Sequence, residues 1–287
     1  MYKKVTENIS EEITLTILFN YFNNKKIRAN LTISFSKNSM IKQVYADFRK
    51  SLSKRVLDNR SRRFYNNNVT LLCNNCIGGI ILHDLKQKFN TPTINLYFHA
   101  PDYIAFLERL KFYLNAEITF SNISKYDAEL RPYPVGKIDD IEMHFVHYHN
   151  AEEAKEKWEA RVKRVNFENI FIIGSDRDHC TPEIINRFLK LPYKNKIFFS
   201  SKKSTSPEII FFKAYSDKVE VGDLIDEGHS WYFHFDVVRW LNTGQVKRWY
   251  VVAFLFNING SIKRLYKKIN RSQEKYERSL TNTTPVQ

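Results

Sequence analysis

Ile170-Phe171-Ile172-Ile173 is an apolar run of four residues, and Thr181-Pro182-Glu183 follows it after a polar loop. The run is uncharged and rich in β-branched and aromatic residues, which predicts a buried strand. A threonine before a proline and a glutamate predicts the first turn of a helix, which we expect to continue to Lys190. This stretch therefore predicts one strand–loop–helix unit of an α/β fold.

The same alternation of strand and helix extends in both directions from this unit. Further strands are predicted at residues 68–73, 94–98, 141–148, 197–199 and 209–212. Further helices are predicted at residues 49–65, 80–88, 101–113, 150–165 and 237–244, with Asn150 as a cap and Gly244 as a stop. This alternation predicts a mainly parallel sheet in a three-layer α/β/α, Rossmann-like fold. The likeness of successive units also allows an internal duplication.

The 287 residues carry a net charge of +14, and this charge lies in the two ends of the chain. Residues 1–65 hold 14 basic and 5 acidic side chains, residues 66–244 hold 22 and 24, and residues 245–287 hold 9 and 2. Together with the strand–helix pattern, this predicts an N-terminal attachment (1–48), an α/β domain (49–244) and a basic C-terminal extension (245–287). No apolar run of about 18 residues is present to predict a transmembrane helix.

The cysteines and the charge also bear on location and partners. Cys73, Cys76 and Cys180 are too few for a disulfide framework, and together with an N-terminus that lacks signal-peptide features they suit a cytoplasmic protein. Basic ends on a near-neutral body argue against nucleic acid as a partner, because nucleic-acid enzymes carry cations around the working groove. The aromatic and basic segment from Trp249 onward predicts either contact with an anionic membrane at its inner face or a helix docked on the domain core.

Polar or reactive side chains follow three of the predicted strands, where parallel sheets place their chemistry. The first cluster is Asn74-Asn75-Cys76-Ile77-Gly78-Gly79. Asn74, Asn75 and Cys76 stand between a strand and a helix, whose N–H groups we expect to lower the pKa of the thiol and to bind an anion. Gly78 and Gly79 would let the backbone approach a ligand. The alternative is a tight turn with a buried, inert cysteine.

The second cluster lies within residues 139–148. Strand alternation places Glu142 and His144 on one face and His147 on the other. A carboxylate and an imidazole on one face can form the orienting pair that a general base needs, and Asp140 is a candidate ligand group. A metal would need ligands from elsewhere, and the cysteine spacings match no zinc pattern, so we predict no metal site. The alternative is a satisfied polar pair at a strand end.

The third cluster, Asp176-Arg177-Asp178, stands shortly before the helix that Pro182 opens. Arg177 can hold a phosphate or carboxylate through its planar guanidinium while Asp176 and Asp178 orient sugar hydroxyls. The same loop can equally be a turn closed by its own ion pairs.

Six motifs in a fixed order carry a resemblance to a known family. They are Asn74-Asn75-Cys76-Ile77-Gly78-Gly79, Ala100-Pro101-Asp102-Tyr103, Tyr133-Pro134-Val135-Gly136, Asp140-Ile141-Glu142-Met143-His144-Phe145-Val146-His147-Tyr148, Lys157-Trp158 and Asp176-Arg177-Asp178-His179-Cys180-Thr181. Over residues 50–243 the chain resembles an uncharacterised bacterial domain family from capsule and exopolysaccharide biosynthesis loci, often labelled exopolysaccharide biosynthesis protein. The resemblance implies a three-layer α/β/α fold and a role in surface polysaccharide assembly. Cys73 and His179 depart from the pattern of the family, which has serine and glycine there, so His179 is a poor candidate for an essential group.

Three function classes remain open from the sequence. The first is a transferase that acylates a sugar from acyl-coenzyme A, with Cys76 as nucleophile, His144 as base and Glu142 orienting the imidazole. The second is a glycosyl- or phosphosugar-transferase that binds a nucleotide sugar at Asp176-Arg177-Asp178, with a structural Cys76. The third is a non-catalytic partner in polysaccharide assembly. The expected substrate is a saccharide or a lipid-linked saccharide.

Overall fold

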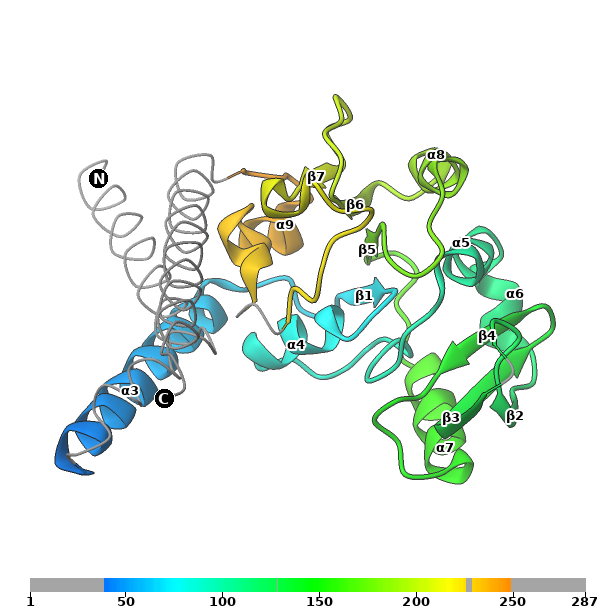
Figure 1. Cartoon of the computed structure of the whole chain (residues 1–287), viewed down its shortest axis with the longest axis horizontal. Helices are drawn as coiled ribbons and strands as arrows, with labels where there is room; N and C mark the ends of the chain where they lie inside the picture. The colour runs from blue at the N-terminus through cyan, green and yellow to red at the C-terminus, as the bar shows by residue number, and fades with distance from the viewer. Residues whose placement is uncertain (1–38, 128, 226–228, 249–287) are drawn as a thin grey trace, which may run out of the picture.

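A parallel sheet of four strands forms the centre of the molecule. The computed structural model describes residues 39–127, 129–225 and 229–248. The strands are β1 (Thr70–Cys73), β5 (Ile170–Ser175), β6 (Asn195–Ser200) and β7 (Ile209–Phe211), and they lie side by side in that order (Figure 1). Every neighbouring pair is parallel. The predicted strands at these four places and the predicted parallel pairing are confirmed.

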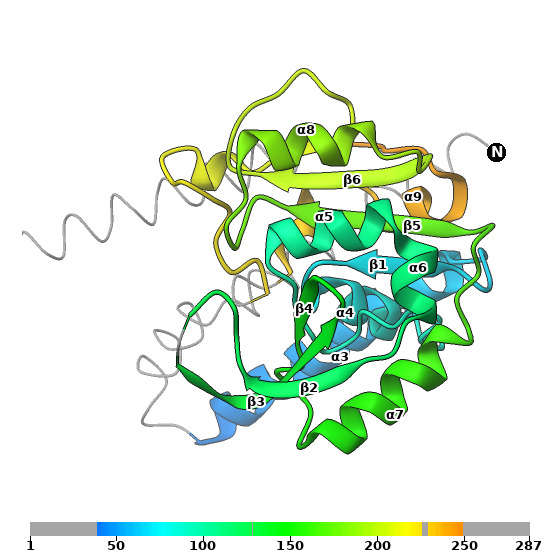
Figure 2. The ribbon, with the colours of Figure 1, turned by 90° about the vertical axis from the view of Figure 1, so that its right-hand side faces the viewer.

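Helices cover both faces of this sheet, which explains why each of its strands contains a run of buried apolar residues. Figures 1 and 2 show α5 (Ala100–Glu108) and α8 (Pro182–Lys190) on one side of the sheet, and α4 (Ile77–Asp84) and α9 (Val237–Thr243) on the other. Alternate side chains of each strand enter two separate apolar clusters: Leu72 joins the first, and Leu71 the second. The α/β class is therefore confirmed.

The helix ends follow the local signals in the sequence. Asn150 accepts a hydrogen bond from the Glu153 N–H at 2.8 Å and caps α7 (Ala151–Val162). Thr181 caps α8 by accepting from the Ile184 N–H at 3.3 Å. Gly244 takes a left-handed conformation with φ of 73° directly after α9, as a stop residue requires. The remaining helical segments within the described residues are α3 (Ser39–Arg63), α6 (Leu110–Asn115), and the 3-10 turns η1 (Lys213–Tyr215) and η2 (Ser230–Phe233).

A second, antiparallel sheet corrects part of the prediction. It consists of β2 (Thr119–Ile123), β3 (Leu130–Ile138) and β4 (Ile141–His144), set apart from the parallel sheet in Figure 2. Residues 141–148 were expected to form a strand of the parallel sheet, but only the first four form one, and it pairs with β3. The cause is the two-residue turn at Asp139, whose φ of 52° suits a tight hairpin. A hairpin forces antiparallel pairing.

Two further expectations also need correction. Residues 94–98 form no regular strand, and Tyr97 makes only an isolated antiparallel bridge to His144. The predicted helix at 101–113 is divided into α5 and α6 at Arg109, where φ is −122°. The first change follows from the position of β4, because the chain at Tyr97 pairs with His144 and not with a strand of the parallel sheet.

Among the residues that the structure describes, no helix is both long and apolar enough to cross a membrane. The predicted N-terminal attachment, apart from residues 39–48, and the predicted membrane-contacting segment from Trp249 onward lie outside the described residues. Both stay predictions.

Candidate functional site

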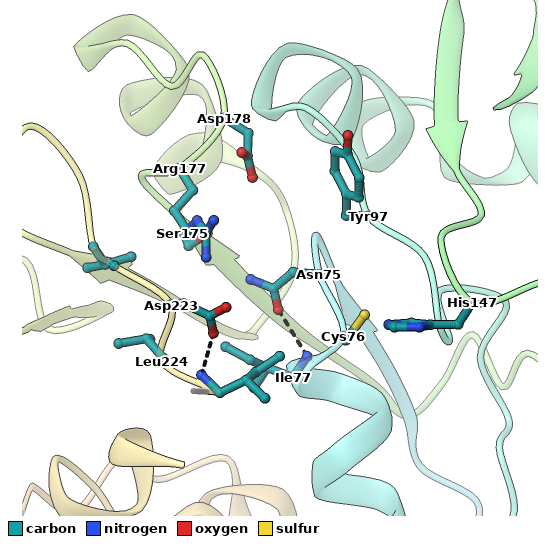
Figure 3. A pocket seen from close by; sticks show the side chains of 13 residues that line it. Asn75, Cys76, Ile77, Tyr97, His147, Ser175, Arg177, Asp178, Asp223 and Leu224 are labelled. Carbon is teal, nitrogen blue, oxygen red and sulfur yellow. Dashed lines mark hydrogen bonds between the residues drawn. The ribbon is translucent and has the colours of Figure 1, made fainter. Parts of the chain in front are cut away.

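A pocket of about 400 Å³ opens at the carboxyl ends of β1 and β5 (Figure 3). Three loop segments and two aromatic side chains line it: Asn75, Cys76, Ile77, Ser175, Arg177, Asp178, Val221, Gly222, Asp223, Leu224, Ile225, Tyr97 and His147. The first and third predicted clusters therefore meet here, as expected for the ends of parallel strands, and His147 is the one residue of the second cluster in the lining.

The connections of β1 and β5 explain why the pocket forms at this place. β1 leads into α4 on one face of the sheet, and β5 leads into α8 on the other. Neighbouring strands whose following helices go to opposite faces leave a crevice beyond their carboxyl ends, where α/β proteins bind ligands. Asn74 fixes the spacing of the two ends, because its side-chain amide donates to the Ser175 hydroxyl at 3.0 Å. Asn74 is buried and lies under the pocket rather than in its lining.

Asn75 and the two glycines organise the start of α4. Asn75 precedes the N-cap residue Cys76, and its side-chain oxygen accepts from the N–H of Ile77, the first residue of α4, at 3.0 Å. Asn75 also lines the pocket. Gly78 and Gly79 do not line the pocket; both lie buried inside α4. A Cβ added at Gly78 would lie 2.9 Å from the Cβ of Cys73, so this glycine serves close packing of helix on strand. The expected role of the glycines in ligand approach is not supported by their position.

The two glycines give a matched pair of variants. We expect Gly78→Ala to lower the free energy of unfolding by about 1–3 kcal/mol, because the new methyl overlaps the Cys73 side chain on β1. Gly79→Ala is the control: its Cβ would lie 3.5 Å from the nearest atoms of Ile94, an ordinary contact, and alanine favours helix by up to about 1 kcal/mol. Urea unfolding measures both, and equal stability of the two variants would contradict the packing role.

The three members of the third cluster have different roles. Asp176 is buried, and its carboxylate accepts from the backbone N–H groups of Ser201 at 2.6 Å and Val221 at 2.7 Å. It also accepts from the Ser200 hydroxyl at 3.1 Å. Asp176 therefore does not line the pocket; it ties the end of β6 and the 221–225 loop to the end of β5.

Arg177 and Asp178 line the pocket, as expected for ligand-binding groups. The Nε of Arg177 is buried and has no hydrogen-bond partner among the described residues. Asp178 and His179 both have positive φ, 59° and 67°, a strained backbone of the kind held in place at functional sites. Burial raises the pKa of Asp178, while the Arg177 charge opposes this rise.

Cys76 lies in the pocket, but its thiol is not activated in the expected way. Figure 3 shows the sulfur directed toward His147. Burial, with a smaller contribution from the Asp223 charge, raises the pKa of Cys76 to about 11. The expected lowering by the helix N-terminus is therefore wrong, because loss of hydration outweighs the effect of the N–H groups of a short helix.

Glu142 and His144 form the expected pair, yet they do not line the pocket. His144 Nε2 lies 3.1 Å from a Glu142 carboxylate oxygen, and both side chains are almost fully buried. Burial by itself raises the pKa of Glu142, but hydrogen bonds from the Lys125 N–H and Ser124 hydroxyl, with the nearby His144, hold it below its usual value. The ring of Tyr97 stacks on His144 with centroids 4.4 Å apart, and Tyr97 itself lines the pocket.

Asp140 lies away from the pocket, in the β3–β4 turn. It is exposed, and one carboxylate oxygen accepts from the Tyr113 hydroxyl at 2.6 Å, which holds the pKa of Asp140 below its usual value. Nothing in this position supports a ligand-binding role.

Several pocket residues were missed from the sequence. His147 was placed on the opposite face from His144 by strand alternation, but the strand ends at His144, so that argument no longer applies. Tyr97 and Asp223 come from segments without regular structure, and no spacing in the sequence connects them to Cys76 or Arg177. The one local signal is the second cluster itself, whose last residues reach the pocket.

The sheet, its helices and the crevice between β1 and β5 define an α/β protein with a polar pocket at the carboxyl ends of parallel strands. Residues 47–242 match a family described as a domain of unknown function, DUF1919, and the chain belongs to this family. The chain is also 39% identical over 186 residues to an uncharacterized protein of Haemophilus influenzae, an alignment that covers 63% of this chain and 87% of the relative. The resemblance drawn from the six motifs is thus confirmed at the level of the family.

Proposed function

We propose that this protein is a transferase of bacterial surface polysaccharide biosynthesis that binds a phosphorylated sugar donor in the pocket between β1 and β5. The observation that carries the proposal is the buried Nε of Arg177, which lines the pocket without a hydrogen-bond partner among the described residues. Arg177 as a whole is half-buried, and a guanidinium at the wall of a pocket can bind a bidentate anion such as phosphate. The pocket volume of about 400 Å³ lies in the range of small-molecule sites. The polysaccharide context comes from the resemblance of the motifs.

The lining residues support distinct roles in such a transfer. Arg177 would bind the phosphate of the donor and stabilise the charge that the leaving phosphate gains. Asp178, whose pKa is raised by burial, is suited to accept the proton of an acceptor hydroxyl as that oxygen bonds to the donor. The electron pair of the broken bond leaves with the phosphate group. Asn75 and Asp223 supply further polar groups for sugar hydroxyls.

The parallel sheet supports the same proposal at the level of fold. An apolar cluster packs on each face of the sheet, with helices over both, as in three-layer Rossmann-like proteins. Such folds bind phosphorylated ligands beyond the carboxyl ends of their strands. The basic C-terminal extension and the lipid-linked saccharides expected as substrates are consistent with work at the inner face of a membrane.

Acyl transfer is the second candidate, and the Cys76 sulfur directed toward His147 in the pocket favours it (Figure 3). In this mechanism His147, rather than His144, takes the thiol proton while the sulfur bonds to the acyl carbon and coenzyme A leaves. The acyl group then passes from sulfur to a sugar hydroxyl, and the thiol regains its proton.

A thermal-shift series separates the two candidates. At a ligand concentration one hundred times Kd, binding stabilises the folded chain by about 2.7 kcal/mol, which raises Tm by several degrees. We expect this rise with nucleotide sugars and not with acetyl-coenzyme A. A rise with acetyl-coenzyme A alone would favour acyl transfer, and no rise with any nucleotide sugar or sugar phosphate would contradict the donor site.

The reactivity of Cys76 provides an independent check. Because its pKa is about 11 instead of 9, the thiolate fraction at pH 8 is about 100-fold lower than that of an ordinary thiol. In a Cys180→Ser variant, where the other remaining thiol, Cys73, is buried, we expect slow alkylation by iodoacetamide at pH 8. The rate should rise about tenfold per pH unit up to about pH 10. A rate that is already constant above pH 7 would show an activated thiolate and favour the acyl mechanism.

A further inference from the structure

A second group of functional side chains lies outside the pocket lining, where the two sheets meet. His99 directly precedes α5, and Glu142 and His144 lie on β4. One ligand atom from each of the three lies within 4.8 Å of the others, and all three side chains are buried. We propose that His99, Glu142 and His144 bind a divalent first-row transition metal, for which zinc is the probe.

The observation that points to a ligand is the buried imidazole of His99, which lacks hydrogen-bond partners among the described residues. Its side chain is 8% exposed, and neither ring nitrogen has a hydrogen-bond partner among the described residues. Burial of a polar group without a partner costs about 1–3 kcal/mol in proteins, so a buried imidazole normally binds something. The ring is held among aromatic neighbours, with centroid distances of 3.9 Å to Tyr126 and 4.9 Å to both His144 and His179. A metal ion would satisfy one of its nitrogens.

Glu142 and His144 are already arranged as ligands would be. The Glu142 oxygen and His144 Nε2 are 3.1 Å apart, close to the separation of about 3.3 Å between two ligand atoms on one tetrahedral zinc. In the metal-free arrangement the proton between them forms a hydrogen bond, and a bound cation would displace it. Two imidazoles and one carboxylate make a donor set that zinc uses with a fourth, open position.

The surrounding groups orient the ligands, as outer-sphere partners do in metal sites. The second oxygen of Glu142 accepts from the Lys125 N–H at 2.9 Å, and the first accepts from the Ser124 hydroxyl. His144 Nδ1 lies 3.5 Å from the Tyr133 hydroxyl, which provides a partner for the ring nitrogen that faces away from the metal. The nearby Asp102 carboxylate is paired with the Lys125 ammonium at 2.5 Å and so is not a competing ligand.

The sequence did not reveal His99 as the third ligand. The expectation of no metal rested on the need for ligands beyond Glu142 and His144. His99 stands more than forty residues earlier in the chain than Glu142, and two long-range contacts bring it to β4: the bridge between Tyr97 and His144, and the hydrogen bond from the Glu142 N–H to Asp102 on α5.

Zinc titration of the chelator-treated full chain tests the proposal, with the ion competed against a chromophoric chelator. We expect one zinc per chain and a binding constant that falls roughly 100-fold or more in His99→Phe, because one of three ligands is lost. Phenylalanine suits the aromatic surroundings of His99, and circular dichroism checks that the variant folds. The control is His147→Gln, which removes an imidazole that lines the pocket and should leave zinc affinity within about threefold.

Cobalt provides a measurement that needs no variant. At the proposed site Co²⁺ should give the visible bands of a four- or five-coordinate ion with nitrogen and oxygen ligands, without the near-ultraviolet absorption of a cobalt–thiolate bond. Four results would each overturn the proposal. They are a protein that takes no zinc from the chelator, unchanged zinc affinity in a folded His99→Phe variant, loss of zinc affinity in His147→Gln, and a cobalt–thiolate band from Cys76.

Discussion

Asp176→Ala is expected to lower the free energy of unfolding by about 3–5 kcal/mol, although Asp176 stands in the loop predicted to bind ligand. The substitution leaves two backbone N–H groups, of Ser201 and Val221, and the Ser200 hydroxyl without their acceptor in a buried place. Each buried donor without a partner costs about 1–3 kcal/mol, partly offset where water can enter. Urea unfolding monitored by circular dichroism measures the loss.

Asp178→Ala, two residues further along, is the matched control. Its carboxylate lines the pocket, and burial already raises its pKa, so the folded protein gains little from the charge. We expect a stability change within about 1 kcal/mol, as for most substitutions without a structural partner. If the two variants were equally unstable, Asp176 would not be the residue that holds the loops together.

Arg177→Lys is expected to weaken binding of a nucleotide sugar by about 10- to 100-fold. A lysine keeps the charge but cannot offer the planar pair of N–H donors, and hydrogen bonds to charged groups contribute about 1.5–3 kcal/mol each. Isothermal titration with the nucleotide sugar that gives the largest thermal shift measures the change.

Arg187→Lys controls for a general effect of the substitution. Arg187 lies on α8 and forms an exposed pair with Glu108, with nitrogen–oxygen distances of 2.9 and 2.6 Å. It does not line the pocket, so donor affinity should stay within about twofold. Donor affinity that is equally unchanged in Arg177→Lys would return the 176–178 loop to a purely structural role.

The parallel sheet could be predicted because its signals are local. A strand buried on both faces contains a continuous apolar run, so Ile170-Phe171-Ile172-Ile173 in β5 stands out against its polar neighbours. The helix caps at Asn150 and Thr181 are also local, because each side chain accepts a hydrogen bond from the backbone N–H three residues later, and the structure confirms both caps. Because strand ends of a parallel sheet share one edge, Asn75 and Arg177 could be expected in one site from these signals alone.

The placing of the antiparallel sheet and of the buried Glu142–His144 pair depends on longer-range contacts. All four residues of β4 are buried, as in a parallel strand, and its apolar residues Ile141 and Met143 join the same core as Phe145 and Trp158, so burial and pattern do not reveal its direction. The length of a strand decides which of His144 and His147 faces the pocket, and strand ends are the least certain part of any pattern. The pKa of Cys76 depends on its burial and on the charge of Asp223, which stands far along the chain, and no local motif contains either.

Hydrogen–deuterium exchange of the full chain, with and without a saturating nucleotide sugar, tests the donor site most directly. We expect slower exchange in peptides that contain residues 75–77, 175–178 and 221–225, because these segments carry most of the residues that line the pocket. The Arg177→Lys variant at the same ligand concentration should show a smaller effect at the same peptides. Slower exchange confined to other parts of the chain, or no change with any nucleotide sugar, would contradict the assignment of this pocket as the donor site.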